Sequence, residues 1–306
     1  MAYTHVLTII RPNDHTEDLE SFTESFSSHM KRMMVDDFTL TLLSENTAFD
    51  LKFTEKELEE NHTITSTLQG ICENTPGFDW FIQPLEHRKK KMLIADMDST
   101  MITIECIDEL ADYAGIKDKV SEITERAMQG ELDFHAALIE RVALLKDMKA
   151  SVLMACYEEK VAFTAGAYES VQTMLKKGAV TALVSGGFTY FTEKVSSHLG
   201  FQHHKANILE IKEDRLTGAI LPPISDSQTK IDTLHELAER FNINPSDIMA
   251  VGDGANDIPM IKGAGVGVAY KAKEKARSAA DFQINYTDLK SILYIQGYTE
   301  DQILTP

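Results

Sequence analysis

Cysteine, glycine and proline are all scarce in this sequence. Its three cysteines, Cys72, Cys106 and Cys156, are 34 and 50 residues apart, so they form neither a C-x-x-C pair nor an even-numbered disulfide framework. With 16 glycines and 8 prolines among 306 residues, the chain is not fibrous or of low complexity. We therefore expect a globular protein that folds in a reducing compartment without covalent cross-links.

Basic residues and long apolar runs are also few. The chain has 30 Lys and Arg against 48 Asp and Glu, a net charge of −18 that repels nucleic acid and anionic lipid, so neither is an expected partner. No apolar run approaches the ~18 residues of a membrane-spanning helix. The first residues lack a charged segment before an apolar stretch, as a secretion signal would require. The sequence predicts a cytoplasmic protein.

The length suits about two domains. The first 86 residues read as strand, helix, strand, strand, helix and strand, an order typical of a ferredoxin-like α+β domain. The predicted strands cover 5–10, 38–43, 49–53 and 79–82, and the predicted helices cover 16–31 and 55–72.

A basic run, His87–Lys91, follows Pro84 and marks the predicted domain boundary, with the second domain at 87–306. A run of this kind is usually a solvated linker face, and the alternative is a patch that docks an anion. Every candidate catalytic residue follows the run. We therefore expect the second domain to fold and act without the first.

Beyond the boundary, apolar strands alternate with helical periods, which predicts a doubly wound, Rossmann-like parallel α/β sheet covered on both faces. The predicted strands cover 92–95, 179–184, 247–251 and 266–269, with a hairpin at 206–221. Roughly 60 residues more than one βαβ unit needs separate the first two strands. Apolar residues recur there at helical spacing, which predicts a helical cap over about 104–165.

Polar loops follow three of these strands, at the sheet edge where open α/β proteins bind ligands. Asp96 and Asp98 follow the first strand, and period-two alternation would aim both carboxylates the same way. Such a pair can share a magnesium ion, or can take different pKa values so that one carboxyl attacks while the other acts as an acid. The alternative is a pair of aspartates that cap a helix.

The loop Gly252–Asp257, with sequence GDGAND, resembles a dinucleotide-binding motif except at its last residue. Carboxylates beside a pyrophosphate are unfavourable without a metal. We therefore interpret Asp253 as a magnesium ligand with Asp257 or Asn256 behind it. The alternative is a glycine turn that caps the following helix.

Four ordered motifs together resemble the haloacid dehalogenase superfamily. They are D-x-D-x-T at Asp96–Thr100, S-G-G at Ser185–Gly187, Lys230, and Gly252–Asp257. Longer stretches resemble the phosphoserine phosphatases of that superfamily, including AMQGELDF at Ala127–Phe134 and RVALLK at Arg141–Lys146. The resemblance covers about 88–295, and 1–86 resembles the ACT-like domains that some of these enzymes carry.

The resemblance implies a Mg²⁺-dependent hydrolase that releases L-serine and phosphate from O-phospho-L-serine through an aspartyl-phosphate, the last step of serine biosynthesis. It implies that Asp96 attacks phosphorus and that Asp98 is the acid and base. The implied metal ligands are Asp96, the carbonyl of Asp98, and Asp253. The implied phosphate and substrate contacts from the core are Ser185, Gly186, Lys230 and Asn256.

For the amino-acid end of the substrate, the resemblance implies Glu105 on the ammonium and Arg141 on the carboxylate, an arrangement that suits their charges. Without the resemblance these residues read as a first-turn helix glutamate and a snorkelling surface arginine. Met128 and Phe134 would supply apolar walls.

The cap also departs from the family pattern. Many relatives have serine and arginine where this chain has Ala137 and Ile139, so a hydroxyl and a second guanidinium are absent. A phosphatase for another phospho-amino alcohol such as phosphohomoserine, and a non-catalytic amino-acid sensor, stay open as alternatives. The sequence also leaves the oligomeric state open, a homodimer included.

Overall fold

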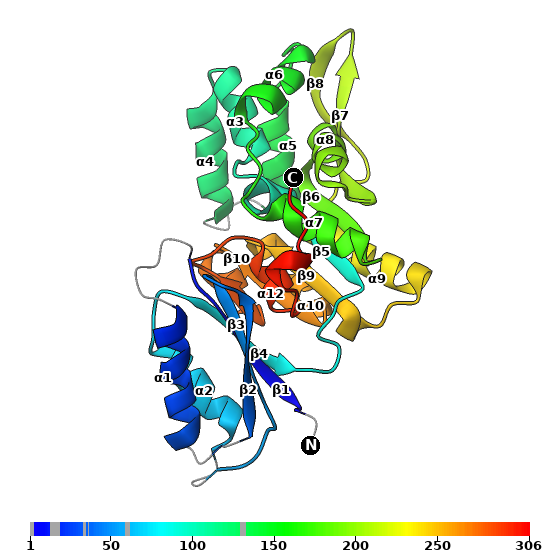
Figure 1. The fold of residues 1–306 in the computed structure, drawn as a ribbon. Coiled ribbons are helices and arrows are strands. Elements are labelled where there is room, and N and C mark those ends of the chain that lie inside the picture. The colour runs from blue at the N-terminus through cyan, green and yellow to red at the C-terminus, as the bar shows by residue number, and fades with distance from the viewer. Residues whose placement is uncertain (1–2, 13–18, 33–34, 36, 59–61, 129–132) are drawn as a thin grey trace.

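In the computed structural model, the chain forms two sheets with helices packed on them (Figure 1). The structure describes residues 3–12, 19–32, 35, 37–58, 62–128 and 133–306. None of the helices in these ranges is long and apolar enough to cross a membrane.

The first domain is a four-stranded antiparallel sheet in the order β2-β3-β1-β4. Its elements are β1 (His5–Ile10), α1 (Leu19–Arg32), β2 (Phe38–Ser44), β3 (Ala48–Phe53), α2 (Ile64–Glu73) and β4 (Asp79–Pro84). Both helices cover the same face of the sheet (Figure 1). Alternate strand residues such as Leu7 and Ile9 pack against Phe26 of α1 and Leu68 of α2. This is the predicted ferredoxin-like arrangement.

Helix α2 is shorter than predicted. The predicted helix begins at residue 55, whereas α2 begins at Ile64. Thr63 and Ser66 form a reciprocal capping box, in which each side chain accepts a hydrogen bond from the other's backbone N–H. The cap fixes the helix start there.

The second domain contains a seven-stranded sheet in the order β11-β10-β9-β5-β6-β7-β8. Its strands are β5 (Met92–Ala95), β6 (Val180–Phe188), β7 (His203–Lys212), β8 (Arg215–Leu221), β9 (Ile248–Gly252), β10 (Val266–Tyr270) and β11 (Phe282–Ile284). All neighbours pair in parallel except the edge hairpin β7–β8. The doubly wound core is therefore confirmed, with one antiparallel edge strand.

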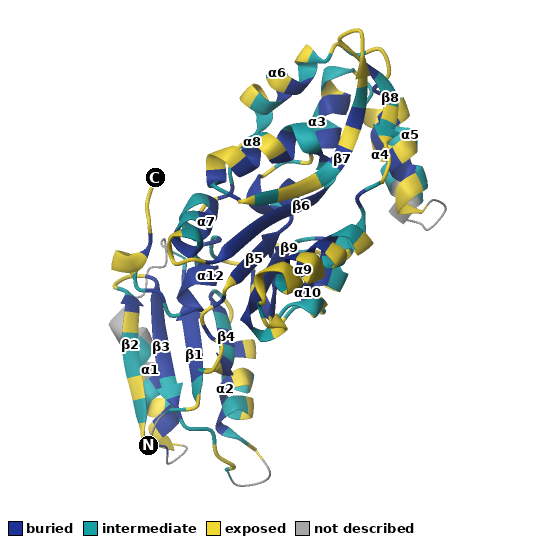
Figure 2. Ribbon diagram, turned by 90° about the vertical axis from the view of Figure 1, so that its right-hand side faces the viewer, coloured by how far each residue is buried: buried dark blue, intermediate teal, exposed yellow. Residues whose placement is uncertain are grey.

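Helices cover both faces of this sheet (Figure 2). They are α7 (Ala167–Lys176), α8 (Thr189–Leu199), α9 (Ser227–Phe241), α10 (Ile258–Gly263), α11 (Glu274–Arg277) and α12 (Ser291–Tyr294). Along β5, Met92 and Ile94 join the apolar cluster of α9 and α10, while Leu93 joins the cluster of α7, α8 and α12. Because both faces are buried, the strand reads as a continuous apolar run.

The predicted cap is helical. It consists of α3 (Cys106–Tyr113), α4 (Lys117–Met128), α5 (Phe134–Ala143) and α6 (Ser151–Lys160), inside the proposed 104–165 range. Its two connections to the core lie side by side, because Thr103 N–H donates to Ala162 O and Thr164 N–H donates to Met101 O. Between α5 and α6, Asp147 N–H donates to Leu216 O of β8. The cap is thus anchored both beside β5 and at the edge hairpin.

The basic run at 87–91 is only partly the expected solvated face, because His87, Lys89 and Lys91 are exposed whereas Arg88 and Lys90 are buried. Arg88 is buried and forms a bidentate ion pair with Asp50 of β3. Its Nη1 lies 2.7 Å from Asp50 Oδ2, and its Nη2 lies 2.6 Å from Asp50 Oδ1. Its Nε also donates to the carbonyl of Ile295 at 2.8 Å. Lys90 is buried too, and Lys91 pairs with Asp247 at 2.7 Å. The run therefore joins the two domains, and the proposed boundary at 86/87 falls within a tightly bonded junction.

Candidate active site

The candidate site lies at the carboxyl ends of β5, β6 and β9; Ser185–Gly187 form the last part of β6, where the pairing with β7 is interrupted between Val184 and Phe188. The β5 loop turns sharply: Met97 begins a short helical turn (Met97–Met101), and Ser99 takes a positive φ of 55°. Asp96 and Asp98 therefore lie in one site but contact different groups, which simple strand alternation does not predict.

Asp96 contacts a buried lysine. Its Oδ1 accepts hydrogen bonds from Met97 N–H at 2.8 Å and from Lys230 Nζ at 2.7 Å. Burial raises the pKa of Asp96 well above its usual range, the Asp257 carboxylate adds to the shift, and Lys230 opposes it. This carboxylate is costly to ionise unless cations stay close.

Lys230 extends from the first turn of α9 and is fully buried between two carboxylates. Its Nζ lies 2.7 Å from Asp96 Oδ1 and 2.5 Å from Asp257 Oδ1. Burial alone would lower the pKa of Lys230, but Asp257 and Asp96 raise it above its usual value. The lysine is therefore a fixed positive charge.

Asp98 has neutral partners. Its Oδ1 accepts from Cys106 N–H at 3.0 Å, and its Oδ2 accepts from Ser185 Oγ at 3.3 Å. Burial raises the pKa of Asp98, and these hydrogen bonds oppose the shift. A Cβ added at Gly187 would lie 2.5 Å from Asp98 Oδ2, so the β6 loop needs glycine here.

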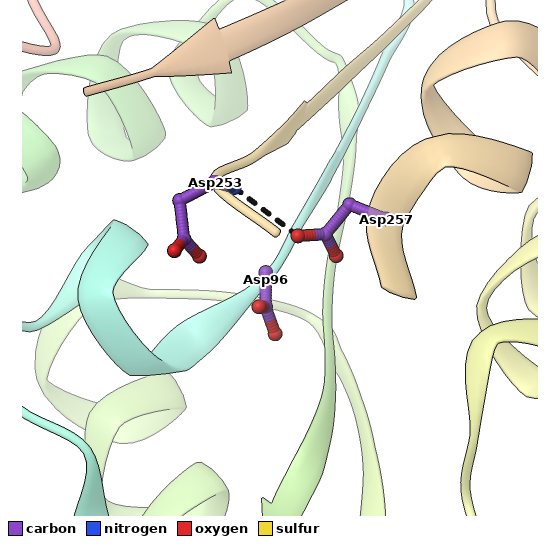
Figure 3. A group of neighbouring side chains, drawn as sticks. All are labelled: Asp96, Asp253 and Asp257. Atoms are coloured by element: carbon purple, nitrogen blue, oxygen red, sulfur yellow. Dashed lines mark hydrogen bonds between the residues drawn. The ribbon is translucent and has the colours of Figure 1, made fainter. Parts of the chain in front are cut away.

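Asp253 completes a carboxylate cluster. One ligand oxygen from each of Asp96, Asp253 and Asp257 lies within 4.8 Å of the others, and Figure 3 shows the three side chains beyond the strand ends. Burial, followed by Asp257, raises the pKa of Asp253 to about 6, while a hydrogen bond from Thr100 Oγ1 at 3.2 Å opposes the shift.

This cluster fits a divalent metal, because carboxylate oxygens are the ligands that hard cations prefer and because three carboxylates surround Lys230. Asp257 is already occupied: its Oδ2 accepts from the N–H groups of Asp253 (3.1 Å) and Gly254 (2.9 Å), and its Oδ1 contacts Lys230. Asp257 therefore shapes the loop, while Asp96 and Asp253 are freer to bind an ion.

Two charged cap residues, Glu105 and Arg141, lie near each other, and Glu105 lies near Asp98. Glu105 stands at the N-cap of α3 and accepts from Ser99 Oγ at 2.7 Å. Partial desolvation raises the pKa of Glu105 to about 7, and Asp98 adds to the shift. Burial lowers the pKa of Arg141, whereas the carboxylates of Asp108 and Glu105 oppose that change. The structure therefore brings Glu105 and Arg141 into the same electrostatic neighbourhood.

The other predicted side chains differ in how the structure places them. Phe134 opens α5 and lies over Gly186, with its Cζ 3.2 Å from where a Cβ on that glycine would stand. Asn256 is half-buried beside Gly254. Met128 ends α4, but its side chain lies outside the described residues. Of the two departures from the family pattern, Ala137 is buried and Ile139 is exposed.

Two supporting residues were missed from the sequence. Asn207 of β7 donates to the carbonyl of Gly186 at 2.8 Å, and its Oδ1 accepts from Ser225 N–H at 2.7 Å. Ser225 Oγ donates to the carbonyl of Ser185 at 3.0 Å. A polar asparagine inside a predicted apolar strand was the available signal, since a buried amide needs partners. Together the two residues fix the Ser185–Gly187 loop.

Comparison with known proteins agrees with this geometry. The haloacid dehalogenase-like hydrolase family matches residues 90–265. A phosphoserine phosphatase from Archaeoglobus fulgidus is 44% identical over 222 residues, which are 71% of this chain and 64% of the archaeal protein. The match thus spans slightly under two thirds of that relative.

Solved structures extend the likeness. A HAD family hydrolase from Salmonella enterica serovar Typhi superimposes with a TM-score of 0.82 at 31% identity, covering 96% of this chain and 98% of that one. A phospho-aspartyl intermediate analogue of phosphoserine phosphatase gives a TM-score of 0.63 at 39% identity, covering 67% of this chain and 98% of that one. This chain therefore belongs to the haloacid dehalogenase-like hydrolases and, within them, to the phosphoserine phosphatase family.

Proposed function

We propose that this chain hydrolyses O-phospho-L-serine to L-serine and inorganic phosphate, with Asp96 as nucleophile and Mg²⁺ as its metal ion. The observation that carries the proposal is the difference between Asp96 and Asp98. Asp96 contacts the Lys230 ammonium, which favours its ionised form, whereas Asp98 accepts from two neutral donors, Cys106 N–H and Ser185 Oγ. A carboxylate beside a cation suits a nucleophile, and a carboxyl that holds its proton suits a general acid.

In the first step, an Asp96 carboxylate oxygen attacks phosphorus and forms the acyl-phosphate bond. The bond between phosphorus and the serine oxygen breaks, and that oxygen takes the proton of Asp98. L-Serine leaves, and Asp98 becomes a carboxylate. The Salmonella and phospho-aspartyl structures support this step by their similarity in fold and sequence.

In the second step, Asp98 removes a proton from water, and the water oxygen attacks phosphorus. The bond to Asp96 breaks, inorganic phosphate leaves, and both aspartates regain their starting states. The hydrogen bonds to Asp98 from Cys106 N–H and Ser185 hold the carboxyl group in place through both proton transfers.

The metal would be held by Asp96, Asp253 and the backbone carbonyl of Asp98. When bound, Mg²⁺ would neutralise charge on the phosphate oxygens and on the crowded carboxylates. Lys230, Ser185 and the Gly186 N–H are proposed to grip the phosphate oxygens. Lys230 and Ser185 are buried and hydrogen-bonded, which supports this role because fixed donors need no reorganisation during the reaction.

The cap supplies the proposed amino-acid contacts. Arg141 would pair with the substrate carboxylate and Glu105 with its ammonium, which the shared neighbourhood of these two side chains supports. Phe134, Met128 and Asn256 are proposed to line the remaining walls.

Phosphate release from a substrate panel, with and without chelator, tests the function. The panel contains phosphoserine, phosphohomoserine, phosphoethanolamine and a phosphosugar. We expect the highest kcat/KM for phosphoserine and loss of activity on chelation. Equal rates across the panel would reject the substrate, and full activity in chelator would reject the metal.

A further inference from the structure

One contact joins α5 of the cap to the N-terminus of α9 in the core and has no role in the proposed reaction. His135 Nε2 of α5 lies 2.9 Å from Asp226 Oδ2, the N-cap residue of α9. Half of the His135 side chain and a quarter of the Asp226 side chain are exposed. The two residues are 91 positions apart, so the contact ties separate parts of the chain.

Asp226 is well placed to anchor the cap. Its Oδ1 accepts from Thr229 N–H at 3.0 Å and thereby caps the helix that carries Lys230. The preceding residue, Ser225, is buried and donates to the carbonyl of Ser185. Asp226 is therefore fixed to both phosphate-binding elements of the core, and its second oxygen remains for His135.

His135 is equally well placed on the cap. Its neighbour Phe134 lies over Gly186. The rings of Phe134 and His135 pack edge to face, with their centroids 5.9 Å apart. Arg141 lies on the same short helix, α5. A contact that holds the start of α5 therefore helps to position Phe134 against Gly186 and the helix that carries Arg141.

We propose that His135 is a positioning residue whose hydrogen bond to Asp226 holds α5 over the phosphate-binding loop and thereby favours substrate binding. The inference rests on the proposed function for its kinetic consequence, but the contact itself can be tested without substrate. Because half of the His135 side chain is exposed, the effect of this contact on binding is modest.

The kinetic test compares His135→Ala with His135→Gln, which keeps a side-chain N–H donor. We expect His135→Ala to raise KM for phosphoserine about two- to fivefold while kcat stays within about twofold, and His135→Gln to restore most of the affinity. The matched control is His235→Ala, an exposed histidine on α9, and it should leave KM unchanged. Equal effects from the alanine and glutamine variants, or from the control, would overturn the proposal.

A double-mutant cycle isolates the pair. Asp226→Ser retains a helix-capping hydroxyl but is too short to reach the cap. In that background His135→Ala should change KM no further. A full additional two- to fivefold rise in the double variant would show that His135 acts through another contact.

Hydrogen exchange on the protein without substrate separates this proposal from the proposed function. The first amides of α5 should exchange faster in His135→Ala, and at the wild-type rate in His135→Gln and His235→Ala. If wild type fails to hydrolyse phosphoserine but these exchange differences appear, the assigned substrate is wrong and the positioning contact stands. Unchanged exchange in His135→Ala would contradict the contact.

Discussion

Two buried cations in this molecule have opposite surroundings. Lys230, in the candidate active site, contacts Asp96 and Asp257, with the carboxylates of Asp98 and Asp253 also nearby. Arg88, at the domain junction, pairs with one carboxylate, Asp50, and also donates hydrogen bonds to neutral acceptors. Those acceptors are the Thr8 hydroxyl and the carbonyls of Tyr294 and Ile295.

This difference separates a reactive centre from a structural one. At the junction, one positive and one negative charge cancel and the donors are satisfied, which is what a stable buried ion pair requires. In the site the negative charges exceed the one lysine, and the pKa of Asp96, Asp98 and Asp253 is raised. Excess negative charge makes sense where another cation is to bind.

The largest expected effect comes from Asp96→Asn. Turnover should fall by about 10⁴-fold or more, because a neutral amide is a poor nucleophile. The melting temperature should not fall, because the pKa of Asp96 is raised in the folded state, so its ionised form costs stability at neutral pH. Steady-state kinetics and thermal melts measure both. Wild-type turnover would contradict the assigned nucleophile.

Deleting residues 1–86 is expected to prevent soluble folding of the remainder, contrary to the sequence-based expectation. Phe81 packs against Phe282 with ring centroids 5.5 Å apart, and Ile10 and Ala48 belong to the apolar cluster of the second domain. The deletion exposes this surface and leaves Arg88 without Asp50. Soluble yield of 87–306, alone and co-expressed with 1–86, measures the effect. A soluble, active fragment produced alone would show that the junction is dispensable.

Arg88→Met should destabilise the chain by about 3–5 kcal/mol, because it leaves Asp50 buried without its cation. Urea unfolding measures this loss, and the double variant Arg88→Met with Asp50→Leu should recover part of it. The folded variant should keep wild-type kcat, since the junction contributes no group to the site. An Arg88→Met variant that keeps its stability but loses kcat would contradict this assignment, because Arg88 would then support catalysis and not the fold.

The smallest expected effect is stabilisation by metal. Mg²⁺ at about a hundred times its dissociation constant should stabilise the metal-free chain by about 2.7 kcal/mol. Asp253→Asn should lose most of this gain, while Arg88→Met should keep it. A gain that survives Asp253→Asn would place the ion elsewhere.

Local patterns predicted the second domain well, and long-range contacts explain the errors. The strands at β5 and β9 are apolar runs followed by polar loops, so the sequence alone placed Asp96 and Asp253 at one sheet edge. The burial of Arg88 depends on Asp50, 38 residues away, and on carbonyls more than 200 residues away, and no local pattern records them.

Backbone geometry limits prediction within the site as well. The turn after β5, with Ser99 at positive φ, gives Asp98 its own partners, and strand alternation cannot anticipate such a turn. Asn207 and Ser225 acquire their roles only when β7 and the segment before α9 meet the Ser185 loop. The candidate catalytic motifs could therefore be found from the sequence, and the contacts that hold them in place could not.

Trapping the covalent intermediate tests the central claim most directly. Enzyme mixed with ³²P-labelled phosphoserine and Mg²⁺ is quenched in acid during turnover, digested and mapped. We predict label on the peptide that contains Asp96, lost in Asp96→Asn and retained in the Arg88→Met variant. No trapped label, or label on any other residue, would contradict an aspartyl-phosphate mechanism through Asp96.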